Sequence, residues 1–348
     1  MSRLHPRAWI AWLAAAIITL SLSRNPVYLL LIILCIAVVS RALRSQAETP
    51  VLPLPLLRLS LVIITLSALF NFVTAHFGQT VLFTLPAGIP LLGGPYTLEA
   101  LVFGMVNGLV LVGFLAAFNV LYQALPTQAL IHMIPRALYP IAVVVSIAVS
   151  FVPATLAQFQ QIREAQMMRG HRVRGLRDWL PLFMPLLVGG LERAFQLAEA
   201  MTARGFGSLG VGQRAGLDPL RVALVVGLAT LLAGLLVLLF WQHEVAGWSL
   251  VALGGGALLM ALRRQGQRVR RTVYRRQPWT GSDGLAIAAA AFTVGVYLLP
   301  ASRGALAWSP YPQLTWPGAD PATVLATLGL LTPAVLLAWP RTESFEHG

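Results

Sequence analysis

The sequence predicts an all-α protein, a polytopic bundle of membrane helices with amphipathic helices on its cytoplasmic side. Of its 348 residues, 57% are hydrophobic and only 11% are charged, whereas soluble domains have about 25% charged residues. The mean hydropathy is +0.75. Apolar stretches that could enter a bilayer recur along the chain, and the longest polar region lies in its middle, at residues 158–207. These observations indicate an integral membrane protein.

All 25 basic residues are arginine, and the formal net charge is +13. In membrane proteins basic residues concentrate in cytoplasmic loops beside anionic lipid, so this excess indicates a lipid bilayer as partner and not a nucleic acid. Because the chain has no lysine, it has neither a GxxxxGK[ST] phosphate-binding loop nor a Schiff-base lysine. If the protein uses ATP, another subunit must therefore hydrolyse it.

The N-terminal region, residues 1–122, is expected to form the first transmembrane helices. The apolar stretches are 9–22, 27–40, 56–75 and 98–122. The first two have only about 14 residues each, fewer than the roughly 20 of a straight span, so they are expected to be tilted, partly embedded or extended into the membrane interface. In the last stretch Gly104 and Gly108 form a GxxxG pattern, which predicts close packing against a neighbouring helix.

The middle region, residues 123–217, is expected to lie on the cytoplasmic side. The stretch 163–177 has five arginines, and the span before it already ends inside. A single crossing by the short apolar segment 139–152 would place these arginines outside. We therefore expect this segment to lie at the inner face of the membrane or to dip into it, unless 123–138 crosses together with it.

Two amphipathic segments in this region end in similar tripeptides. The apolar stripes are Leu156, Phe159, Ile162 and Met167 in the first segment, and Leu191, Ala194, Phe195, Ala198 and Met201 in the second. The ends are Met168-Arg169-Gly170 and Ala203-Arg204-Gly205. One such end is typical of a helix cap, since glycine stops the helix and arginine suits its dipole. Two of them, 35 residues apart, favour two projections for a partner with two equivalent binding places.

The C-terminal region, residues 218–348, is expected to add four spans. The predicted spans are 218–241, 247–262, 284–300 and 323–340. They enclose an internal loop, 263–276, with seven arginines. With both termini inside, only Arg24 and Arg303 face outward, which agrees with the positive-inside rule.

Other motifs do not predict a catalytic, cofactor-binding or metal-binding residue. Gly205–Gly210 matches GxGxxG, but a dinucleotide site needs a strand before this motif and a helix after it. The six histidines are scattered without metal-ligand spacing, and the single cysteine, Cys35, lies in an apolar run. The chain is therefore not expected to be an enzyme.

Several motifs together resemble the transmembrane T component of energy-coupling factor (ECF) transporters, the family that includes the cobalt-transport membrane subunit. The resemblance spans roughly residues 1–242. It is found at His5-Pro6-Arg7, Asn25-Pro26, Thr97–Leu101 with Gly104, Phe151-Val152-Pro153, Glu164–Gly170 and Glu199–Gly207. In that family two Ala-Arg-Gly motifs end the coupling helices, which dock into grooves on a pair of cytoplasmic ATPases. The resemblance thus implies that Met168-Arg169-Gly170 and Ala203-Arg204-Gly205 couple to ATPases, with Met168 at a position where the family usually has alanine.

The resemblance implies a scaffold subunit in the cytoplasmic membrane of a prokaryote, without a cofactor of its own. Such a subunit transmits ATP-driven closure of the ATPase pair to a separate substrate-binding S component, for uptake of a vitamin or a metal ion. Two alternatives stay open. A self-contained secondary permease would favour matching halves, which the sequence does not show. A membrane-embedded enzyme acting on an anionic substrate at Arg163–Arg177 would need a nucleophile or an acid–base pair.

Overall fold

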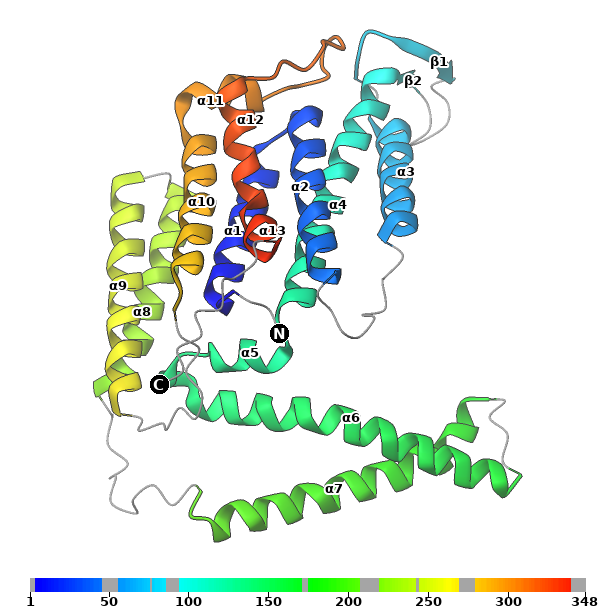
Figure 1. Ribbon diagram of the computed structural model, residues 1–348, viewed down its shortest axis with the longest axis vertical. Coiled ribbons are helices and arrows are strands. Elements are labelled where there is room, and N and C mark those ends of the chain that lie inside the picture. Colours follow the sequence, from blue (N-terminus) through cyan, green and yellow to red (C-terminus); the bar gives the residue numbers. More distant parts are fainter. Residues whose placement is uncertain are drawn as a thin grey trace, which may run out of the picture. The chain divides into compact units, whose positions relative to one another are not determined.

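A computed structural model describes residues 4–45, 56–75, 77–85, 94–170, 175–206, 219–241, 244–268 and 279–338. The described chain is mostly helical (Figure 1), and eight of its helices are long and apolar enough to cross a membrane. The prediction of a polytopic helical membrane protein is confirmed. The chain divides into two compact units, one of Met1–Ala129 with Arg275–Gly348 and one of Leu130–Tyr274. The three-part division into 1–122, 123–217 and 218–348 stays a prediction.

The first unit contains helices from both ends of the chain. They are α1 (Pro6–Leu22), α2 (Pro26–Arg44), α3 (Leu56–Thr74), α4 (Leu98–Ala124), α10 (Gly281–Leu298), α11 (Pro300–Leu306), α12 (Pro321–Leu328) and α13 (Thr332–Ala338). A 3₁₀ turn, Gly329–Leu331, joins α12 to α13, and together they form the candidate span Pro321–Ala338, close to the predicted 323–340. The added Cβ of any larger residue at Gly329 would lie 2.6 Å from Thr293 Oγ1, so the turn packs closely on α10.

The helices α1 and α2 are longer than the apolar segments predicted for them. They have 17 and 19 residues. Each begins with a side-chain cap followed by proline, since His5 Nδ1 accepts from the Arg7 amide and Asn25 Oδ1 from the Val27 amide. At its other end α2 continues through the polar residues up to Arg44. Of the three alternatives for these short runs, extension beyond the apolar part agrees with these lengths, because backbone hydrogen bonding continues past the apolar run.

The core of the first unit joins the N-terminal and C-terminal helices. Trp12 and Leu330 are both fully buried, and Trp12 Nε1 donates to Leu330 O at 2.9 Å. The hydroxyls of Tyr297 on α10 and Thr327 on α12 are 2.8 Å apart. Figure 1 shows α1 and α2, coloured blue, beside α10 and α12, coloured orange to red, so the two ends of the sequence lie side by side. The C-terminal helices are therefore part of the same core as the first two helices.

The GxxxG pattern lies where α4 packs against α3. A Cβ added to Gly104 would lie 2.6 Å from Ser67 O and 2.7 Å from Ala68 Cα, and one added to Gly108 would lie 2.9 Å from Ile64 Cα. Ser67 Oγ also donates to Gly104 O at 2.8 Å. The predicted close approach is confirmed, because any side chain at these two positions would overlap the backbone of α3.

A small antiparallel hairpin, β1 (Val81–Leu85) with β2 (Gly94–Thr97), precedes α4. The sequence did not predict these strands, because glycine and proline dominate the surrounding residues. The rings of Phe83 and Tyr96 stack with centroids 4.6 Å apart. Below the hairpin the buried Glu99 accepts from the Thr80 amide at 2.9 Å.

The second unit contains two helix pairs. Its helices are α6 (Tyr139–Met168), α7 (Leu180–Ala203), α8 (Pro219–Leu236) and α9 (Glu244–Arg268), with a π-helical turn, Val237–Trp241, after α8. Two 3₁₀ turns, Arg136–Leu138 and Leu176–Trp179, precede α6 and α7. The short helix α5 (Thr127–His132) contains the division between the units. Three of the seven arginines predicted for the loop 263–276 belong instead to α9, namely Arg263, Arg264 and Arg268.

The segments predicted around residues 139–203 merge into two long helices. The apolar stretch 139–152 and the amphipathic stretch after it form the 30 residues of α6, which continues through Pro153. Likewise α7 runs for 24 residues through Pro185. Proline removes one backbone hydrogen bond, but helices of membrane proteins tolerate it when the freed groups find other partners. The boundary predicted before Pro153, at the end of the segment 139–152, was wrong.

Candidate functional site

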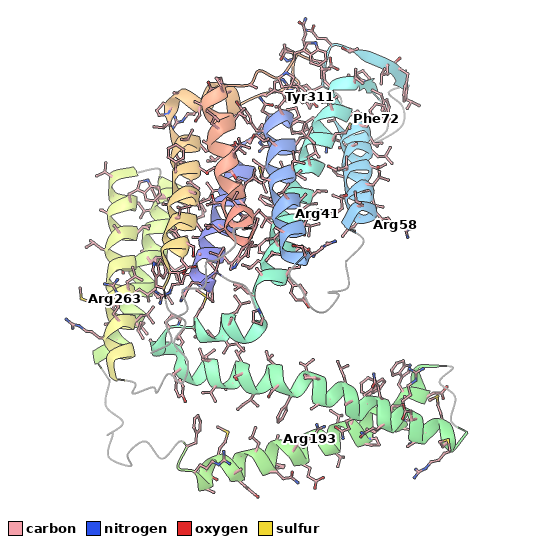
Figure 2. All side chains as sticks on the ribbon, viewed as in Figure 1. Arg41, Arg58, Phe72, Arg193, Arg263 and Tyr311 are labelled. Atoms are coloured by element: carbon pink, nitrogen blue, oxygen red, sulfur yellow. The ribbon has the colours of Figure 1, made fainter. Side chains whose placement is uncertain are left out.

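The helices α6 and α7 form a long hairpin whose arms are joined by a few side-chain contacts. The rings of Phe159 and Trp179 stack with centroids 6.4 Å apart and planes 9° apart. Figure 2 labels Arg193 on α7, whose guanidinium donates to Gln158 Oε1 on α6 and, at 3.3 Å, to Gly189 O. These contacts fix the crossing of the two arms while leaving both C-terminal ends free of it.

The two arms end in the same backbone geometry. Arg169 is the C-cap of α6 with φ −84° and ψ 8°, and Arg204 is the C-cap of α7 with φ −85° and ψ 5°. The glycine that follows each is left-handed, with φ +79° at Gly170 and +78° at Gly205. Each glycine amide donates at 2.9 Å to a carbonyl three residues earlier. Glycine suits these positions because L side chains rarely adopt such angles.

The second end has the full set of Schellman hydrogen bonds. Besides the bond from the Gly205 amide to Thr202 O, the Phe206 amide donates to Met201 O at 2.9 Å. On the first arm the corresponding residue is His171, which lies outside the described residues. The shared part of the two caps shows that both arginines stand at the same place on their helices, one residue before a sharp turn.

All six residues predicted to couple to a partner are exposed at these ends, and Met168 is 90% exposed. The hairpin does not bring the two arginines together. Since α7 has 24 residues, its ends are about 36 Å apart at 1.5 Å per residue. The arms run in opposite directions, so the two arginines lie near opposite ends of the hairpin (Figure 1). The sequence alone did not predict this separation.

The apolar stripe predicted on the second arm is not buried against the first arm. Phe195 is 61% exposed and Leu187 is 65% exposed. The neighbouring apolar residues Met184, Val188 and Leu191 are exposed as well. A continuous apolar surface of this kind marks contact with lipid or with another protein. The hairpin thus combines two exposed basic ends with an apolar face between them.

The residues considered above for metal or nucleotide binding lie apart from one another. Among them no group of three or more His, Cys, Asp or Glu side chains could hold a metal ion. His5 caps α1, and Cys35 is buried in the first unit. In the GxGxxG match, Gly205 and Phe206 belong to the end of α7, while residues 207–210 lie outside the described part of the chain.

A protein-family model described as CbiQ, cobalt transport protein, matches residues 1–214, more than half of the chain. Curated relatives share the name "energy-coupling factor transporter transmembrane protein EcfT". The relative from Leuconostoc gelidum is 38% identical over 72 residues, covering 19% of this chain and 27% of the relative. That from Listeria monocytogenes is 29% identical over 133 residues, covering 32% and 49%. That from Acidaminococcus fermentans is 32% identical over 122 residues, covering 33% and 43%. The chain spans less than half the length of these relatives.

Proposed function

Because the chain belongs to the CbiQ family, we propose that it is the transmembrane T subunit of an ECF-type importer. In this role it connects two cytoplasmic ATPase subunits to a substrate-binding membrane S component. It does not hydrolyse ATP itself, which is consistent with the absence of lysine and of a phosphate-binding loop. The names of its relatives support the same role.

The observation that chiefly supports this role is the pair of matching helix ends. Arg169 and Arg204 have backbone angles that agree within 3° and are each followed by a left-handed glycine. A partner with two equivalent grooves, such as a pair of related ATPases, requires two equivalent projections. A guanidinium has five N–H donors in a planar fork, so each tip can bind several acceptors in its groove at once.

The apolar face between the tips suits the second connection. Closure of the ATPase pair would change the distance between its grooves and so move α6 against α7. The apolar residues on α7, among them Leu187 and Phe195, would pass that movement to a membrane-embedded S component. Only a few side chains hold the crossing, around Gln158 and Arg193, so the two arms can change their angle at limited cost.

The proposed role also implies where the protein lies and which side of the membrane its termini face. The protein lies in the cytoplasmic membrane of a prokaryote, with both termini and the α6–α7 hairpin inside, where ATP is present. The distribution of the arginines supports this orientation. The transported substrate is a vitamin or a metal ion chosen by the S component, and the family description favours a metal ion such as cobalt.

The test is charge reversal at each tip. Arg169→Glu and Arg204→Glu are each expected to abolish uptake and reduce co-purification of the ATPases at least tenfold, since a buried contact with acceptors becomes repulsive. Membrane insertion and thermal melting should stay as in the unchanged chain, because both side chains are exposed. We expect the change at Arg204 to have the larger effect, as its motif has the usual alanine.

The matched control is Arg163→Glu, which reverses an exposed arginine on α6 away from its end. It should keep ATPase capture and uptake. Full uptake and full co-purification in both tip variants would contradict the coupling role. Uptake by this chain alone, in a host without the ATPases, would identify a self-contained permease instead.

A further inference from the structure

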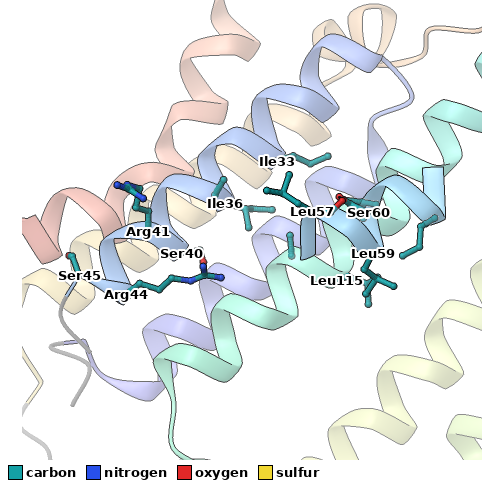
Figure 3. Close-up of a pocket in the computed structure, with 14 residues that line it drawn as sticks. Ile33, Ile36, Ser40, Arg41, Arg44, Ser45, Leu57, Leu59, Ser60 and Leu115 are labelled. Carbon is teal, nitrogen blue, oxygen red and sulfur yellow. The ribbon is translucent and has the colours of Figure 1, made fainter. Parts of the chain in front are cut away.

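The first unit contains an apolar groove that the proposed coupling function does not use. It has a volume of about 710 Å³ and lies among α2, α3 and α4 (Figure 3). Its walls are mainly aliphatic, with Ile33 and Ile36 from α2, Ile63 from α3 and Leu115 from α4. Such a groove accepts a hydrocarbon chain.

The groove becomes polar and cationic toward the C-terminal end of α2. The lining residues Ile33, Ala37, Arg41 and Arg44 recur at helical spacing, so they follow one side of α2 from its apolar part to its end. Ser40 and Ser45 add two hydroxyls beside the arginines. From Ile33 to Arg44 the helix rises about 16 Å, at 1.5 Å per residue. The groove is therefore amphipathic along its length.

The two arginines face no counterion in the described part of the chain. Among the residues that the structure describes, neither guanidinium has a hydrogen-bond or ion-pair partner. Arg41 and Arg44 are three residues apart on one helix, so their positive charges repel each other, and an anion bound near both relieves that repulsion. The C-terminal end of α2, where the two arginines lie, is expected to be cytoplasmic by the positive-inside rule. This mouth of the groove is therefore expected to lie at the cytoplasmic surface.

We propose that this groove binds an anionic glycerophospholipid, with an acyl chain along its aliphatic wall and the headgroup phosphate at Arg41 and Arg44. Basic pockets between transmembrane helices on the cytoplasmic side are suited to anionic headgroups. A second copy of this chain fits less well, because a symmetric contact would bring two more arginines to the same mouth. The bound lipid packs between α2 and α3. A zwitterionic lipid binds there more weakly, because its headgroup has no net negative charge.

The test is native mass spectrometry of the purified full-length chain, titrated with phosphatidylglycerol or with phosphatidylcholine of the same acyl chains. Phosphatidylglycerol adducts should predominate in the unchanged chain. Each arginine near an anionic headgroup contributes roughly fivefold, so Arg41→Gln with Arg44→Gln is expected to weaken this binding on the order of thirtyfold. The matched control, Arg263→Gln with Arg264→Gln on α9, removes the same charge elsewhere and should keep the adducts.

A second variant keeps the charge and fills the groove. Ala37→Phe places a ring on the groove wall and leaves both arginines in place, so it should also reduce the lipid adducts. This variant tests the groove even if the protein with Arg41→Gln and Arg44→Gln fails to fold. Glycerol 3-phosphate has the headgroup charge without an acyl chain and should not displace the bound lipid. Displacement by it would overturn the proposal in favour of a simple phosphate site.

A photoactivatable phosphatidylglycerol locates the site. Its adducts should map to α2, α3 and α4 around Ala37. Equal retention of phosphatidylcholine, unchanged binding in both groove variants, or adducts that map elsewhere would overturn the proposal. So would a protein cross-link from residue 37 to another subunit or to a second copy of this chain, because the groove would then belong to a protein interface.

Discussion

The two helix pairs of the second unit differ in how they are held together. Between α8 and α9 the contact is backbone against backbone. A Cβ added to Gly254 would lie 2.5 Å from Leu231 N, and one added to Gly234 would lie 2.7 Å from Val251 N. Between α6 and α7 the contacts are side chains, namely stacked rings and the bond from Arg193 to Gln158. The helices α8 and α9 thus pack closely along their length, whereas α6 and α7 contact each other mainly where they cross.

The difference indicates which pair can move. Glycine at Gly227 and Gly234 on α8, and at Gly247 and Gly254 on α9, repeats every seven residues on each helix. This spacing keeps the small residues on one side, so the pair packs as a rigid unit. The α6–α7 hairpin leaves its apolar face and both basic ends exposed. Its exposed apolar face is open to contact with lipid or with another protein, and in the proposed function this is the pair that moves.

The largest loss of stability is expected for Gly254→Val. The new side chain would overlap the backbone of α8, which cannot turn aside, so we expect a cost of about 1–3 kcal/mol or more. Thermal melting of the purified chain measures it. The matched control is Gly255→Ala on the same helix, where an added Cβ meets nothing within 4 Å. Since alanine favours helix, the control should be neutral or more stable by up to about 1 kcal/mol. Equal melting of the two variants would contradict the close packing of this pair.

A smaller and local loss is expected for Gly205→Val. The left-handed angle of +78° costs a β-branched residue roughly 1–2 kcal/mol, so the last turn of α7 should open. Faster hydrogen exchange at the Phe206 amide and weaker ATPase capture should accompany unchanged global melting. Asparagine tolerates this angle, so Gly205→Asn should restore most of the slow exchange at the Phe206 amide and most of the ATPase capture. If the valine variant exchanged as slowly as the unchanged chain, the cap would not depend on glycine.

Gly189→Ala is expected to cost still less, below about 1 kcal/mol. The new methyl group would meet the end of the Gln158 side chain, which can adopt another rotamer, whereas the backbone facing Gly254 cannot. Melting should be compared with that of Gly190→Ala, whose Cβ would meet nothing within 4 Å. A loss as large as that of Gly254→Val would show that the crossing of α6 and α7 is as rigid as the α8–α9 pair.

The smallest effect on stability is expected for Phe195→Ser with Leu191→Ser. Both side chains are about 60% exposed, so the free energy of unfolding should change by no more than about 0.5 kcal/mol. Co-purification of the S component should nevertheless fall, while ATPase capture stays. A large drop in melting temperature would mean that the apolar face of α7 is buried within the chain.

Hydropathy and the arginine distribution predicted most of the helices, because crossing a bilayer demands long apolar runs. The matching ends at Arg169 and Arg204 were also visible in the sequence, since left-handed caps need glycine. Contacts between distant segments were not. The seven-residue glycine pairs of α8 and α9 look like ordinary small residues until their partner helix is known. The boundary predicted before Pro153 was wrong because proline ends helices in water more strictly than in lipid.

The closure of the first unit has a consequence for how the chain is made. Asn25 Nδ2 donates to Ala305 O, 280 residues later, and Trp12 Nε1 to Leu330 O, 318 residues later. At 5–20 residues per second, the ribosome needs on the order of tens of seconds to supply these acceptors. Until then the Trp12 indole and the Asn25 side chain lack the acceptors that they have in the finished fold. The core of the first unit is therefore completed only after the C-terminal helices have been synthesised.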